Sequence, residues 1–185
     1  MAIYLLGRPA LSQGVPPDPL DSGLVLSLDF NGNILDTSGA GNSPLPAVVP
    51  FTNNPAGDPF SAAHFDGLSQ FLLVKDSPSL HTPYMTVAFW MRTDAYQTMQ
   101  MAVKARYGDS FGEQWSIYYD TIYFRSSLVY AIKRNGNGRG TGWYSLPLAG
   151  VPVTNQWMHV AGTWDGTNQN LYVDGKLAAR KTDTP

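Results

Sequence analysis

The chain has 185 residues and a net charge of −2, and its charged fraction of 14% is well below the roughly 25% of an average protein. It has no run of Lys or Arg, which argues against nucleic acid as the main partner, and no cysteine, which excludes disulfides and thiolate metal sites. Glycine (18) and proline (14) are frequent and Glu113 is the only glutamate, as is typical of a sheet protein with many turns.

Residues 1–22 differ from the rest of the chain. Residues 3–6 predict a short strand, and the proline-rich residues 8–20 predict an extended arm or linker. Such an arm is either a disordered leader or a segment that docks on a neighbouring subunit. The start lacks a basic region and a long apolar run, so we expect neither a signal peptide nor a membrane span. We therefore expect folding in the cytoplasm, with a place in a virion, or outside the cell if a leader has been removed.

The main domain is predicted to occupy residues 23–185. Residues 23–31 alternate as a strand, with one face formed by Leu24, Leu26, Leu28 and Phe30. Residues 36–42 then form a glycine-containing loop. The side chains of Asp36 and Asn42, with loop carbonyls, could bind Ca²⁺, a hard cation that takes several oxygen ligands. The alternative is an Asx-turn whose glycines adopt positive φ.

The middle of the chain predicts a succession of strands and hairpins. These are residues 47–51, a hairpin over 63–74, residues 85–93, 99–105, a hairpin of 114–119 with 121–125, then 128–133 and 142–146. Residues 85–93 are apolar on both faces, as in a central strand of a sandwich. The glycine-rich residues 134–142 are not a phosphate-binding loop, because no Gly-Lys-Ser/Thr follows and no helix begins there.

The last third of the chain predicts three strands and two turns. Residues 157–164, 171–173 and 176–180 are rich in aromatic, β-branched and small residues. Asp174-Gly175 predicts a two-residue type I′ turn, which needs positive φ at both positions. His159 shares a face with Trp157 and is predicted to be a buried histidine with a hydrogen-bond partner.

Several of these segments resemble LamG-like jelly-roll domains of the concanavalin A-like lectin/glucanase superfamily. They are DTSGAGN (36–42), FDG (65–67), DSPSL (76–80), WMHVAGTWDG (157–166) and LYVDGKL (171–177). The resemblance covers about residues 23–181 and implies an all-β, two-sheet antiparallel jelly-roll sandwich. It also implies closing strands after the last hairpin, which residues beyond Pro185, residues 1–22 or a neighbouring chain could supply.

The resemblance extends to glucanases, which hydrolyse glycosides with paired carboxylates, typically in an E-x-D-x-E pattern on one strand. Glu113 has no acid two or four residues later, and Asp66, Asp165 and Asp174 fall in turns. The histidines are not at metal-ligand spacing. We therefore expect no enzymatic activity.

Aromatic residues and polar loops of the second half predict a carbohydrate site, because sugar C–H faces pack on rings while hydroxyls need polar partners. The predicted ligand-binding residues are Tyr107, Trp115, Tyr119, Trp143, Arg134, Asn137 and Arg139. The alternative is that most of these aromatics pack in the core. We expect a recognition or adhesion module that binds a glycan or protein surface. The alternatives are a virion structural protein, such as a capsid decoration or fibre component, and a glycoside hydrolase.

Overall fold

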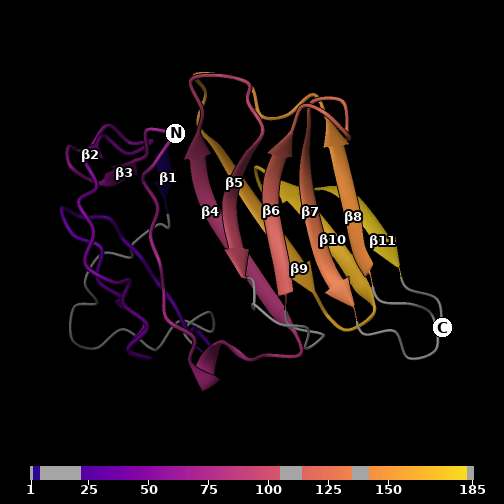
Figure 1. Ribbon diagram of the computed structural model, residues 1–185, viewed down its shortest axis with the longest axis horizontal. Coiled ribbons are helices and arrows are strands. Elements are labelled where there is room, and N and C mark those ends of the chain that lie inside the picture. The colour runs from indigo at the N-terminus through magenta and orange to yellow at the C-terminus, as the bar shows by residue number, and fades with distance from the viewer. Residues whose placement is uncertain (1, 5–21, 105–113, 135–141, 183–185) are drawn as a thin grey trace. The chain divides into compact units, whose positions relative to one another are not determined.

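The computed structural model describes residues 2–4, 22–104, 114–134 and 142–182 (Figure 1). The chain divides into two compact units, Met1–His81 and Thr82–Pro185. Within the described ranges, no helix is long and apolar enough to cross a membrane. The second unit contains most of the strands and is considered first.

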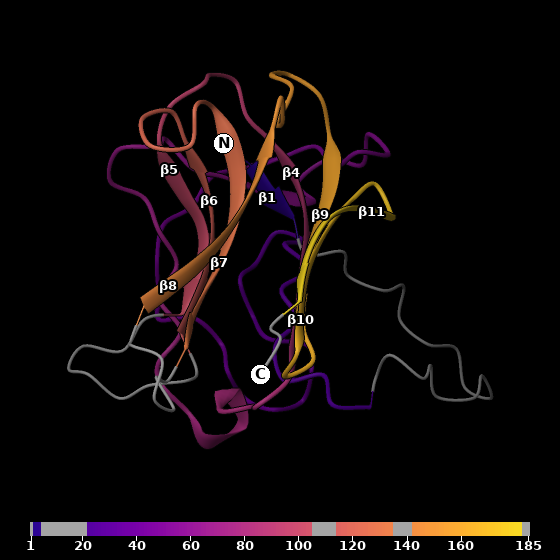
Figure 2. The same ribbon diagram turned by 90° about the vertical axis from the view of Figure 1, so that its right-hand side faces the viewer.

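The second unit is a sandwich of two antiparallel four-stranded sheets, ordered β11-β10-β9-β4 and β5-β6-β7-β8. Figure 2 shows the two layers face to face. The strands are β4 (Met85–Arg92), β5 (Met99–Lys104), β6 (Gln114–Asp120), β7 (Ser127–Arg134), β8 (Gly142–Ala149), β9 (Met158–Trp164), β10 (Asn168–Val173) and β11 (Lys176–Thr182). The predicted all-β, two-sheet antiparallel sandwich is confirmed.

The core of this unit lies between the two sheets and centres on Tyr130 of β7. Its side chain is fully buried, and a Cβ atom added to Gly162 of β9 would lie 3.1 Å from three of its ring atoms. Gln169 of β10 donates a hydrogen bond from Nε2 to the Tyr130 carbonyl over 2.8 Å. Phe89 of β4 and Val160 of β9 are paired across these two neighbouring strands, and both are also buried. A side chain from one sheet therefore packs on the bare backbone of the other.

One predicted strand in this unit is wrong. Residues 121–125 are not the partner of β6, because β6 pairs with β7, which begins only at Ser127. The Asp120 carboxylate accepts hydrogen bonds from the N–H groups of residues 122–124. Arg125 and Ser126, which follow, have positive φ. These interactions bend the chain into a loop although its residue types favour a strand.

The first unit has short strands and a separate small core. Its strands are β1 (Ala2–Tyr4), β2 (Phe51–Thr52) and β3 (Ala62–His64), in the order β1-β3-β2, and one turn of 3-10 helix covers Pro78–Leu80. The buried core residues are Leu28, Phe30, Val49, Ala63 and Phe65. The strand predicted at residues 3–6 is present one to two residues earlier. The rest of the proline-rich arm lies outside the described residues, and the domain boundary at residue 23 stays a prediction.

The predicted strand over residues 23–31 is absent as a ladder. Only one isolated bridge, Leu28 with Asp36, forms there. The alternation still buries Leu28 and Phe30, but Phe30 has a φ of 54°, which takes the backbone out of the extended region. Residues 70–74 also form no strand, and Phe71 and Leu73 are exposed. In residues 23–31 the apolar alternation correctly predicted which side chains are buried. No strand forms there, because the segment has no neighbouring strand among the described residues with which to form a ladder.

Candidate functional site

Four connections of the second unit emerge at one end of its sandwich, which we call the loop end. They are the β4–β5 loop (93–98), the β6–β7 loop (121–126), the β8–β9 loop (150–157) and the β10–β11 turn (174–175). The register explains this placement, because the last residues of β4, β6, β8 and β10 pair with the first residues of their neighbours. In Figure 1 the first three of these loops lie together at the top of the view.

Hydrogen bonds hold the loops of this end to one another. The Thr98 and Thr121 hydroxyls are 2.8 Å apart, and the Thr121 N–H donates to the Thr98 Oγ1 over 3.1 Å. The Asn155 N–H donates to the Thr93 carbonyl over 2.8 Å. The β4–β5 loop is thereby tied to both of its neighbours, so side chains on the loops have a defined spacing.

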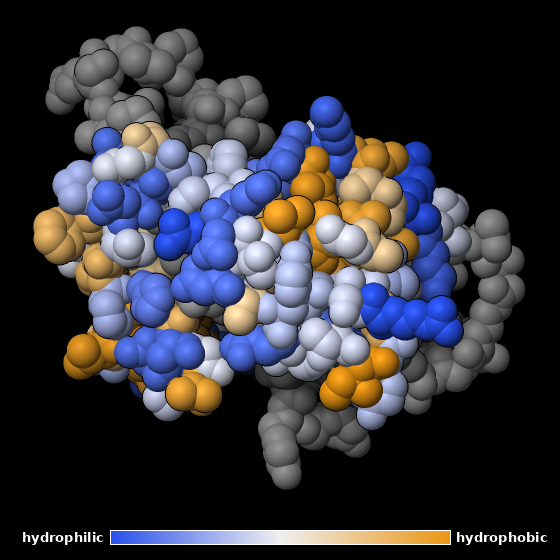
Figure 3. Space-filling model, turned by 90° about the horizontal axis from the view of Figure 1, so that it is seen from above, coloured by the Kyte–Doolittle hydropathy of each residue, from blue (hydrophilic) through white to orange (hydrophobic). Residues whose placement is uncertain are grey.

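Large side chains on these loops are exposed. Tyr96 is 56% exposed, Ile122 70%, Tyr123 83% and Val153 44%. The Tyr96 ring also contacts the buried Tyr119 ring at a centroid distance of 5.9 Å, which anchors one of the exposed aromatics on the core. Figure 3, which views the molecule from this end, shows apolar side chains gathered between hydrophilic ones. Tyr96 and Tyr123 were not among the predicted ligand-binding residues, and the only signal for them in the sequence is an aromatic residue in a segment between two strands.

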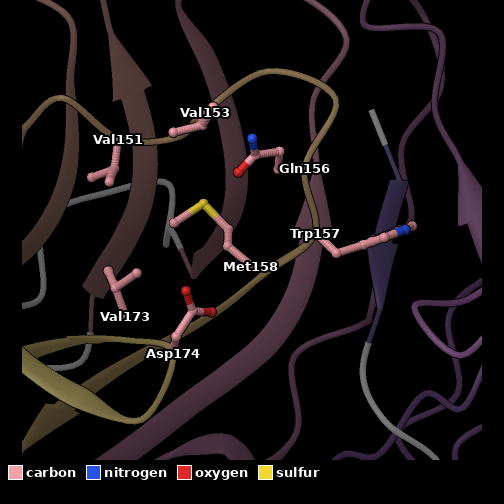
Figure 4. A pocket seen from close by; sticks show the side chains of 7 residues that line it. All are labelled: Val151, Val153, Gln156, Trp157, Met158, Val173 and Asp174. Atoms are coloured by element: carbon pink, nitrogen blue, oxygen red, sulfur yellow. The ribbon is translucent and has the colours of Figure 1, made fainter.

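A small pocket lies on the β8–β9 side of the loop end. It has a volume of about 90 Å³ and is lined by Val151, Val153, Gln156, Trp157, Met158, Val173 and Asp174. Figure 4 shows the valines around the Met158 thioether, the polar ends of Gln156 and Asp174 nearby, and the Trp157 ring directed away. The Arg92 guanidinium carbon lies 5.5 Å from the centre of the Trp157 ring, a cation–π arrangement.

The position of Asp174 is fixed by the turn that contains it. Asp174 and Gly175 have φ of 48° and 75°, which confirms the predicted type I′ geometry. The Asp174 Oδ1 accepts the His159 N–H over 2.8 Å. The His159 ring packs edge-on against Trp90 at 5.5 Å. Burial lowers the pKa of His159 more than the Asp174 charge raises it, so the imidazole is neutral near pH 7.

The predicted ligand-binding residues that the structure describes lie at the opposite end of the sandwich or in its core. Lys104, Trp115 and Ile132 are aligned across β5, β6 and β7, near the end of the sheet opposite the loop end. Trp115 is half-buried there. Arg134 and Trp143 lie at the adjoining ends of β7 and β8. The structure does not describe three of the predicted residues, which are Tyr107, Asn137 and Arg139.

Tyr119 has a different surrounding from the predicted one. It is 2% exposed and pairs with Leu128, on the same face of the sheet as the core residue Tyr130. Its ring therefore has no surface to offer a ligand, and we leave it out of the candidate site. The strand pattern predicted that Tyr119 lies in a strand, but not which face of the sheet its ring occupies.

Both carboxylate oxygens of Asp36, the predicted Ca²⁺ ligand, already accept hydrogen bonds. Oδ1 accepts the Ser27 and Ser38 N–H groups, and Oδ2 accepts the Ser38 hydroxyl and the Asn42 N–H. Burial raises the pKa of Asp36, but these hydrogen bonds together outweigh it and hold the pKa below its usual value. The Asn42 Nδ2 donates to the Val25 carbonyl and the Ser79 hydroxyl. This geometry favours the Asx-turn alternative.

We expect Ca²⁺ to leave the melting temperature unchanged, because binding would have to displace four hydrogen bonds from Asp36. The measurement is a thermal melt in millimolar CaCl₂ against the same melt in EDTA, with MgCl₂ as the control for general ionic effects. A rise specific to Ca²⁺ would show that the carboxylate exchanges its hydrogen bonds for a metal ion.

Other carboxylates of the described residues are also committed to turns. The Asp66 carboxylate accepts the N–H groups of Leu68, Ser69 and Gln70, which lowers the Asp66 pKa strongly. Asp165 accepts the N–H groups of Thr167 and Asn168. The prediction that these aspartates serve turns is confirmed. Among the described residues, no group of three or more His, Asp or Glu side chains could hold a metal ion. Glu113 lies outside the described residues.

Comparison with known proteins places the second unit within a family. Residues 66–185 match the family model Laminin_G_3, described as the concanavalin A-like lectin/glucanases superfamily. The motif at 36–42 lies outside the matched region. No curated protein matches the sequence. Because the match covers more than half of the sequence and the sandwich has the expected two antiparallel sheets, this chain belongs to the concanavalin A-like lectin/glucanase superfamily.

Proposed function

We propose that this chain is a non-catalytic recognition module that binds a glycan or a protein surface through the loop end of its second unit. The observation that carries the proposal is a pair of exposed tyrosines, Tyr96 and Tyr123, on loops joined by the Thr98–Thr121 hydrogen bonds. A tyrosine ring packs on sugar C–H faces or on apolar side chains, and its hydroxyl bonds to polar groups. Loops that are already held in place lose little conformational entropy on binding.

The absence of catalysis in this proposal rests on how the carboxylates are used. A glycosidase needs two carboxyl groups facing one bond, one of them free to donate a proton. Asp36, Asp66, Asp120 and Asp165 accept backbone N–H groups of turns and loops, and Asp174 accepts the N–H of His159 in β9. For Asp36, Asp66 and Asp165 these hydrogen bonds hold the pKa below its usual value, so these three carboxylates are poor proton donors.

The proposal predicts that Tyr96→Ala/Tyr123→Ala weakens ligand binding by roughly tenfold or more, because two aromatic contacts are lost. Binding is measured on a glycan array and then by affinity electrophoresis with the glycans that bind. The matched control is Tyr96→Phe/Tyr123→Phe, which keeps both rings and should keep most of the affinity. Absence of any glycan signal would reject the glycan ligand, and unchanged binding by the alanine variant would reject the loop end as the site.

A further inference from the structure

The pocket beside the loop end has the size of a sugar substituent and not of a whole ligand. Its volume of about 90 Å³ is far below the roughly 300–1,000 Å³ of pockets that enclose a small molecule. It has room for a few waters only, since a cavity needs roughly 10–15 Å³ of this volume to hold one water. A group of three or four heavy atoms fills such a space while the rest of the ligand remains outside on the loops.

The lining combines an apolar floor with two polar groups. Val151, Val173 and Met158 supply aliphatic surface around the pocket (Figure 4). Asp174 is held by its turn, with Oδ1 accepting the His159 N–H. A carboxylate has about four lone-pair sites, so it can accept a further hydrogen bond. Gln156 is exposed at the margin, and its carboxamide both donates and accepts.

We propose that this pocket accepts the acetamido group of an N-acetylated amino sugar. This inference rests on the proposed function, in the case where the ligand is a glycan. The methyl group lies on Val151, Val173 and Met158. The amide N–H donates to the Asp174 carboxylate, and the amide carbonyl accepts from the Gln156 Nε2. The sugar ring then extends toward the exposed aromatics of the loop end.

The main competing occupant is an alkylammonium group, such as a lysine side chain or a free amino sugar. An ammonium group has donors only, so it can donate to Asp174 and to the Gln156 Oε1, but it has no methyl group to place on the apolar floor. An exposed ion pair with Asp174 would also be weak and screened by salt. A neutral acetamido group uses the apolar floor and both polar groups, and its binding is insensitive to salt.

The test uses three methyl glycosides at millimolar concentration: N-acetylglucosamine, glucose and glucosamine. The readout is the NMR shift of the Met158 methyl group in the full chain. We expect N-acetylglucosamine to bind roughly tenfold tighter than glucose, from one buried methyl group and one charge-assisted hydrogen bond. Equal binding of the two, or no shift of Met158 with either, would overturn the inference. Stronger, salt-sensitive binding of glucosamine would overturn it in favour of a cation site.

Two variants locate the effect. Val153→Phe fills the mouth of the pocket and should abolish the Met158 shift, whereas Val103→Phe, the same change at a similarly exposed position of β5, should not. Asp174→Asn keeps a turn-forming Asn-Gly pair and an acceptor for His159, and should weaken N-acetylglucosamine severalfold. Retained selectivity in Val153→Phe would overturn the inference. If oligosaccharide binding requires Tyr96 and Tyr123 but is the same with and without the N-acetyl group, the pocket inference is wrong and the proposed function is retained.

Discussion

Replacing Gly162 by valine should lower the free energy of unfolding of the second unit by about 3 kcal/mol, because the new side chain enters space that Tyr130 occupies. A Cβ atom alone would lie 3.1 Å from three ring atoms of a fully buried tyrosine. The ring cannot withdraw, since it is enclosed between the sheets. Urea denaturation followed by tryptophan fluorescence measures the change.

A double-mutant cycle isolates the steric cause of this effect. Tyr130→Ala removes the ring that meets the Gly162 substituent, so the double variant should be more stable than the sum of the two single changes predicts. Gly162→Ala provides a graded control and should cost less than valine, because only one carbon enters. Strict additivity of Gly162→Val and Tyr130→Ala would show that the two residues do not interact in this way.

Replacing Asp120 by alanine should destabilise the second unit by about 2–4 kcal/mol and weaken ligand binding at the loop end. The Asp120 side chain is 4% exposed, and its carboxylate accepts the N–H groups of Ile122 and Tyr123 over 2.6 Å and of Phe124 over 3.3 Å. Without it these donors lose their acceptor and the loop that carries Tyr123 loses its bend. Denaturant unfolding measures the first effect, and affinity electrophoresis measures the second.

Asp120→Asn is the matched control for this prediction. It keeps the size and one acceptor oxygen at the position that receives the three N–H groups, so it should retain most of the stability and the binding. A binding loss in Asp120→Ala without a change in stability would contradict the structural role given to this carboxylate. Full binding by a destabilised Asp120→Ala would instead show that Tyr123 needs no fixed loop to act.

The sequence predicted those features that depend on neighbouring residues. Asp174-Gly175 predicted its turn because only a few residue types accept positive φ at two successive positions. Asp66 and Asp165 predicted turns because a short carboxylate reaches the N–H groups that follow it. The strands at 85–93 and 157–164 were found because their apolar pattern, including Phe89 and Val160, matches burial in a sheet.

The prediction failed where a residue's role depends on a distant partner. Residues 121–125 have the composition of a strand, yet the hydrogen bonds to Asp120 make them a loop. Residues 23–31 alternate correctly but have no ladder partner beyond one bridge. Tyr119 was predicted as a ligand-binding residue, with packing in the core as the alternative, because a single sequence does not say which face of a sheet is covered.

The sequence by itself therefore determined the class of fold, the main strands of the second unit and the family, since these follow from local pattern and turn chemistry. Only the tertiary structure decided where a ligand could bind. The register of eight strands brings Tyr96, Tyr123 and the Val151–Asp174 pocket to one end, although the sequence separates them by tens of residues. Strand pairing and core packing set that assembly, and neither leaves a signal in a short stretch of sequence.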